Sequence, residues 1–69
     1  MDEEMHKYAE TKILKFIKEY MIKNRWAPSI REICDGVGIP STYTVHHHLK
    51  RLADSGKVVY EGIRKIRVI

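Results

Sequence analysis

Three consecutive histidines, His46 to His48, offer the most varied chemistry in this sequence, because imidazole can ligate metal ions, move protons or form hydrogen bonds near neutral pH. Neighbouring side chains of a helix project about 100° apart, so three adjacent rings cannot chelate one ion. No His, Cys, Asp or Glu nearby completes a set of three or four ligands. The sequence therefore predicts no metal site. We expect His46 and His47 to form hydrogen bonds with a ligand, whereas His48 packs and donates to a local acceptor.

Catalytic constellations are missing from the sequence. It has no Gly-rich phosphate loop, no paired carboxylates in a plausible pocket and no nucleophile with a partnered base. Cys34 is the single cysteine, and its place beside a helical apolar stripe is typical of a small core residue. A chain of 69 residues would also form a substrate pocket with difficulty. We therefore predict that this chain is not an enzyme and needs no cofactor.

Two short helices joined by a turn must position the histidines. Ser29 and Glu32 have the spacing of a capping box, which predicts that the first of the two helices begins directly after Pro28. Gly38 suits the left-handed conformation that ends helices. The apolar side chains between them recur at spacings of three and four: Ile30, Ile33 and Val37. A second helix is expected from about 42 to 55, with Ser41 as its N-cap.

The second helix is amphipathic, and its polar face is the candidate binding surface. Its inward stripe comprises Val45, Leu49 and Leu52, and its outward side chains are Tyr43, His46, His47 and Lys50. A short exposed helix of this kind, packed on another helix, can enter the major groove of B-DNA. The pair therefore has the pattern of a helix-turn-helix.

The remaining sequence predicts a supporting helix and a hairpin. Residues 4–23 are amphipathic, and the KVVYE and IRKIRVI segments flank Gly62 as two strands. Such a ribbon must pack on the helices to be stable, which gives an α+β winged helix-turn-helix with a three-helix bundle and a two-stranded antiparallel hairpin. We expect Trp26 to cover one edge of the core, the alternative being that its ring stacks on a base. Arg64 and Lys65, near the hairpin turn, could contact DNA backbone or minor groove, or simply keep the hairpin soluble.

Charge and length limit the class of protein. The net charge is +4, but residues 1–10 carry −3 and residues 11–69 carry +7. A basic folded part is expected of a protein that binds a polyanion, although many soluble domains carry such a surface. The chain fits a single domain, 1–69, and has neither a signal peptide nor an apolar run that could span a membrane. We expect a cytoplasmic protein without membrane contact.

The segment PSIREICDGVGIPSTYTVHHHLKRLADSGKV resembles the N-terminal DNA-binding domain of the LexA repressor family, a winged helix-turn-helix that represses bacterial SOS genes. The resemblance extends less sharply over the first helix and the last strand. It implies base contacts from the start and outer face of the second motif helix, by Ser41, Tyr43, Thr44, His46 and His47. Tyr43 is bulkier than the family's usual residue at its position, and His47 replaces a smaller or acidic one. The operator sequence is therefore expected to differ from known SOS boxes.

The resemblance also implies partners. Members of the family carry a second domain with a self-cleaving Ser-Lys peptidase that supplies dimerisation, and none of it lies within these 69 residues. We expect a double-stranded DNA operator with two-fold symmetry, bound by a homodimer that forms through the missing domain. The strand-like ending at Ile69 agrees with a longer parent protein; a stop codon directly after Ile69 would refute this.

Two functions of different classes follow from these observations. The first is sequence-specific DNA binding by a bacterial or phage transcriptional repressor, with the 42–55 helix in the major groove and Lys50, Arg64 and Lys65 as further DNA contacts. The second is a winged-helix module that binds a protein partner instead. DNA binding should weaken steeply between about 50 and 200 mM salt, which separates the two.

Overall fold

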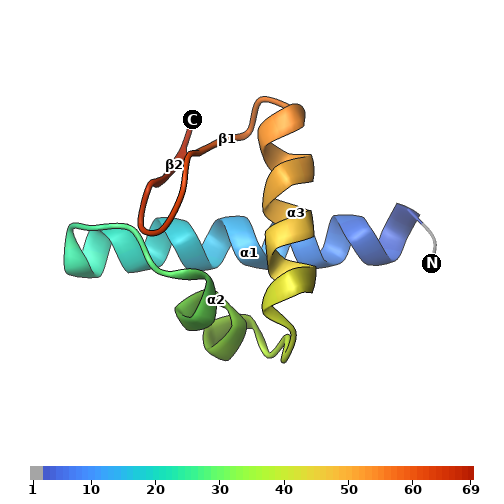
Figure 1. Cartoon of the computed structure of the whole chain (residues 1–69), viewed down its shortest axis with the longest axis horizontal. Helices are drawn as coiled ribbons and strands as arrows, with labels where there is room; N and C mark the ends of the chain where they lie inside the picture. Colours follow the sequence, from blue (N-terminus) through green and yellow to red (C-terminus); the bar gives the residue numbers. More distant parts are fainter. Residues whose placement is uncertain (1–2) are drawn as a thin grey trace.

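Three helices and a hairpin form the chain in a computed structural model, which describes residues 3–69. In chain order they are α1 (Glu3–Asn24), α2 (Ile30–Val37), α3 (Thr42–Asp54), β1 (Val58–Tyr60) and β2 (Ile66–Val68). Figure 1 shows α3 running across α1, with α2 and the hairpin on opposite sides of α1 in this view. The predicted fold class, an α+β winged helix-turn-helix, is confirmed.

Capping residues set the bounds of α2 as the sequence predicted. The Glu32 amide donates to Ser29 Oγ at 3.2 Å, and the Ser29 amide donates to Glu32 Oε1 at 2.8 Å, so the capping box is complete. At the other end Gly38 has φ 75°, and its amide donates to the Cys34 carbonyl. This left-handed residue stops α2 and turns the chain toward α3.

The core lies where α2, α3 and the hairpin meet α1. The predicted stripe of α3 is buried, as are Ile33 and Val37 of the α2 stripe, whereas Ile30 is only partly buried. Ile13 and Ile17 of α1 are buried in the same core. The full set of buried apolar residues is Ile13, Ile17, Ala27, Ile33, Cys34, Val37, Val45, Leu49, Leu52, Val58 and Ile66. Cys34 is thus a core residue, as predicted. The close packing of α1 on α2 depends on Gly36, since a Cβ there would overlap with the ring of Phe16.

Trp26 does not cover the core, and the expectation placed on it is wrong. Its side chain is 57% exposed, whereas the next two residues, Ala27 and Pro28, are buried. Arg25 precedes it with φ 68°, and the Arg25 amide still donates to the Met21 carbonyl at the end of α1. The chain leaves α1 at Arg25, so that Trp26 is exposed and the two residues after it are buried.

The hairpin is shorter than the strand-like sequence indicated. Its antiparallel register pairs Val58 with Val68 and Tyr60 with Ile66. Residues 62–65 form a turn, which is closed by a hydrogen bond of 3.0 Å from the Lys65 amide to the Gly62 carbonyl. Arg64 occupies the left-handed region in this turn, with φ 57°. Ile63, expected within a strand, is accordingly 83% exposed.

Candidate nucleic-acid interface

The exposed face of α3 begins with a capped first turn. Ser41 Oγ accepts the Thr44 amide hydrogen at 3.2 Å, which satisfies one of the free amides at the start of the helix. Both side chains are half-buried. Ser41 and Thr44 therefore stand at the end of α3 that enters the groove first in helix-turn-helix proteins.

Tyr43 and His47 lie one helical turn apart and form the most prominent part of this face. Tyr43 is 71% exposed, and its ring centroid is 5.7 Å from that of His47 at an interplanar angle of 42°. His47 and Lys50 are also exposed. Aromatic and imidazole edges together offer apolar contact and hydrogen-bonding groups, which are the means by which base edges are distinguished.

His46 lies at the side of this face that borders the hairpin. Its Nδ1 is 2.7 Å from the Tyr60 hydroxyl, and the two rings meet edge to face with centroids 5.5 Å apart. The ring is half-buried. The helical wheel placed His46 on the polar arc but could not show this contact, because Tyr60 comes from β1, a separate element. The only signal in the sequence is the strand period of two, which places Tyr60 on the same face of β1 as Val58.

His48 is buried, as its place at the edge of the apolar stripe predicted. Its Nδ1 lies 3.5 Å from Glu10 Oε2, and Arg51 Nε donates to the same oxygen at 2.8 Å. Glu10 belongs to α1, so this cluster links α1 to the inner side of α3. The three histidines thus have three different surroundings: a hairpin tyrosine, the outer face and an interhelical carboxylate.

Arg64 and Lys65 lie in the hairpin turn, as expected, but in different surroundings. Arg64 Nη1 donates to the Ala27 carbonyl at 3.0 Å and lies 3.1 Å from Glu32 Oε1. The Lys65 side chain is exposed. The Arg64 guanidinium therefore connects the hairpin turn to the start of α2, a role that the sequence did not indicate, while its part in DNA contact stays a prediction.

The Glu32 carboxylate contacts both the Ser29 amide at the start of α2 and Arg64 in the hairpin turn. The hydrogen bond from the Ser29 amide, followed by that from the Arg64 guanidinium, lowers the pKa of Glu32 to about 2. One carboxylate consequently serves both the cap of α2 and the hairpin turn.

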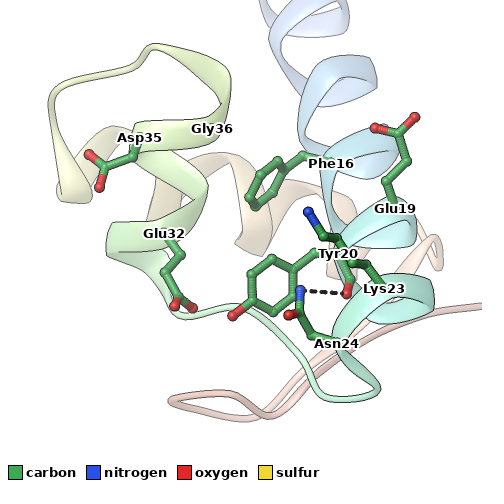
Figure 2. A pocket seen from close by; sticks show the side chains of 8 residues that line it. All are labelled: Phe16, Glu19, Tyr20, Lys23, Asn24, Glu32, Asp35 and Gly36. Carbon is green, nitrogen blue, oxygen red and sulfur yellow. Dashed lines mark hydrogen bonds between the residues drawn. The ribbon is translucent and has the colours of Figure 1, made fainter.

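Hollows lie beside the helices, and two of them concern the elements described above. The larger, of about 500 Å³, lies between α1 and α2 and is drawn in Figure 2; its lining residues are Phe16, Glu19, Tyr20, Lys23, Asn24, Glu32, Asp35 and Gly36. Three carboxylates against one lysine disfavour a phosphate there. The smaller, of about 430 Å³, lies between α3 and the hairpin, and His46, Lys50 and Tyr60 line part of it. It borders the exposed face of α3.

Residues 3–69 contain neither a cluster of metal-ligating side chains nor a membrane-spanning helix. No three His, Cys, Asp or Glu side chains in that range gather as a metal-binding group. No helix in the same range is both long and apolar enough to cross a membrane.

Comparison with known proteins assigns the chain to a family. The family model described as the LexA DNA binding domain matches residues 7–63. The LexA repressor of Carboxydothermus hydrogenoformans is 55% identical over 49 residues, which cover 71% of this chain and 24% of that protein. The LexA repressor of Clostridium perfringens strain SM101 is 42% identical over 60 residues, or 87% of this chain and 29% of the relative. The chain spans about a quarter of the length of these relatives. It belongs to the LexA DNA binding domain family.

Proposed function

We propose that residues 1–69 act as one domain that binds double-stranded DNA sequence-specifically, as the DNA-binding part of a LexA-like transcriptional repressor. The single observation that carries this proposal is the exposed face of α3. This face presents Tyr43, His47 and Lys50 near the capped N-terminus of α3, and the apolar stripe on the opposite face of the helix is buried in the core. This is the geometry in which a recognition helix enters the major groove.

Each side chain of the face has a proposed part. Base edges are read by the N-cap residue Ser41 and by four residues of the first two turns of α3: Tyr43, Thr44, His46 and His47. Lys50, one turn further along, meets a phosphate, where a compact ammonium is suited to a point-charge contact. Lys65 extends this contact from the hairpin turn. The Arg64 guanidinium already contacts Ala27 and Glu32, but its side chain is 44% exposed. The exposed part of the guanidinium contacts the DNA backbone or the minor groove.

Dimeric binding on a two-fold symmetric site is a further part of the proposal. One domain of this size offers a small DNA interface, so two linked copies gain affinity through their effective concentration. The relatives named LexA repressor are about four times as long as the matched region, which leaves room in those proteins for a dimerising part. The 69-residue chain alone should accordingly bind a half-site weakly.

Salt dependence tests the proposal. Duplexes selected from a random pool at low salt should lose affinity steeply between about 50 and 200 mM salt, because each phosphate contact releases condensed counterions. Lys50→Ala should reduce the slope of this dependence by about one. Tyr8→Phe, a change at an exposed residue of α1, is the matched control and should leave both affinity and slope unchanged. Failure to bind any duplex at low salt would overturn the proposal and favour a protein partner for the face.

A further inference from the structure

We propose that Tyr60 of the hairpin is a positioning residue that fixes which ring nitrogen of His46 carries the proton, so that His46 presents an Nε2–H donor to the major groove. This inference rests on the proposed function, since it concerns how one of the proposed base-reading residues is set. It starts from the contact of 2.7 Å between the Tyr60 hydroxyl and His46 Nδ1. A neutral imidazole has one donor and one acceptor nitrogen, and the partner of one nitrogen determines the state of the other.

The direction of the hydrogen bond follows from the chemistry of the two groups. A phenol is a good donor and a poorer acceptor, because its oxygen lone pairs are delocalised into the ring. Burial raises the pKa of Tyr60, so the hydroxyl keeps its proton near neutral pH. The hydroxyl therefore donates to Nδ1, and the proton of a neutral His46 ring resides on Nε2.

The hairpin holds the hydroxyl at this place. Tyr60 and Val58 lie on the same face of β1, and Val58 is buried in the core. Tyr60 pairs with Ile66, which is also buried. The edge-to-face contact with the imidazole, at 70°, adds a second restraint on the ring of His46. Both rings line the hollow beside α3, so the His46 ring is set at the edge of the face that would meet DNA.

A fixed Nε2–H donor has a consequence for base preference. In the major groove the acceptors are purine N7, guanine O6 and thymine O4, whereas cytosine N4 and adenine N6 are donors. His46 should therefore favour an acceptor edge at its operator position. Without the Tyr60 hydroxyl, both neutral forms of the ring become accessible, and the ring could also accept a hydrogen bond from a donor edge.

Tyr60→Phe tests this directly, because it removes only the hydroxyl and keeps the ring that contacts His46. The ¹⁵N spectrum of the ring nitrogens of the 69-residue chain should show the Nε2–H form for His46 at a pH where the spectrum shows the ring to be neutral. In Tyr60→Phe the His46 signals should move toward a mixture of both forms. The exposed His47 ring serves as an internal reference, and Tyr8→Phe is the matched loss of a hydroxyl elsewhere.

Selection from a random duplex pool supplies the second readout. Tyr60→Phe should relax the preference at one base pair and lower affinity for the selected duplex by about threefold to tenfold, the worth of one hydrogen bond. Its affinity for an unrelated duplex should stay unchanged. An Nδ1–H form in the unaltered chain, an unchanged spectrum in the variant, or an unchanged base preference would each overturn the proposal.

A parallel His46→Ala selection separates this inference from the proposed function. If His46→Ala changes the base preference and Tyr60→Phe does not, His46 reads a base without help from Tyr60, and only the positioning role fails. If neither variant changes it, the assignment of His46 to the base-reading set fails as well. If the unaltered chain binds no duplex at low salt, the DNA-binding function itself is contradicted.

Discussion

Arg64 Nη1 lies 3.1 Å from Glu32 Oε1, and this contact joins the hairpin turn to the capping box of α2. The same carboxylate oxygen accepts the Ser29 amide hydrogen. A cap that belongs to the helix-turn-helix is thereby coupled to the hairpin, so the position of the hairpin beside α3 depends on a residue at the start of α2.

The first prediction concerns acid stability. The folded-state pKa of Glu32 is lowered to about 2, so its carboxylate adds stability that is full above the ordinary glutamate pKa and is lost as the pH falls through about 2. Glu32→Gln keeps a side chain that can complete the capping box but removes the charge. The variant should show a weaker decrease in the free energy of unfolding from about pH 5 to pH 2. Urea unfolding across this range measures it.

Glu19→Gln is the control for this comparison. Glu19 lines the same hollow but belongs to α1 and is exposed to solvent. Its replacement removes one carboxylate without touching the cap. A Glu32→Gln variant with the same acid dependence as the unaltered chain would show that the hydrogen bonds to the Glu32 carboxylate do not stabilise the folded state in solution.

The second prediction concerns two arginines with left-handed backbones, Arg25 with φ 68° and Arg64 with φ 57°. A left-handed conformation costs a residue with a Cβ roughly 1 to 2 kcal/mol, and glycine avoids this cost. Glycine, however, loses more conformational entropy on folding, which offsets roughly 0.5 to 1 kcal/mol of the gain. Arg25→Gly should therefore stabilise the chain by about 0.5 kcal/mol, or raise the melting temperature by about 2 to 4 °C.

Arg64→Gly gains the same backbone relief but loses the contacts with Ala27 and Glu32. It should therefore be less stable than Arg25→Gly in the same melting experiment. Equal gains from the two variants would mean that the Arg64 guanidinium adds nothing to the folded state.

The third prediction concerns the contact of α1 with α2. Gly→Ala inside a helix normally stabilises it by about 0.5 to 1 kcal/mol. At Gly36, however, the new Cβ would overlap with the Phe16 ring, so the ring or the helix must move. Gly36→Ala should destabilise the chain by roughly 1 to 3 kcal/mol in urea unfolding.

Phe16→Leu is the partner variant, because it shortens the side chain that would clash. In the Gly36→Ala/Phe16→Leu double variant, the cost of adding the methyl group should be smaller than in the presence of Phe16. A Gly36→Ala variant more stable than the unaltered chain would show that α1 and α2 are not packed this closely.

Local signals in the sequence predicted the helices and the inward residues well. The Ser29 and Glu32 pair, Gly38 and the spacing of Val45 and Leu49 act within a few residues, so each could be interpreted without knowledge of the fold. The outward placement of His47 follows from the same periodicity.

Contacts between separate elements could not be predicted in this way. The His46–Tyr60 and Arg64–Glu32 pairs depend on where the hairpin packs, which no local pattern encodes. Trp26 shows the same limit: an indole between two helices was expected to pack on the core, but the backbone after Arg25 leaves Trp26 exposed and Ala27 buried.

Comparison of base preferences tests the central claim, that the exposed face of α3 reads DNA sequence. The unaltered chain, His47→Ala and Lys50→Ala would each select duplexes from one random pool at low salt. The unaltered chain should enrich a defined motif. His47→Ala should change that motif at one position, whereas Lys50→Ala should weaken binding to all duplexes alike and keep the motif. Enrichment of no motif by the unaltered chain, or the same motif and affinity in all three, would contradict the claim.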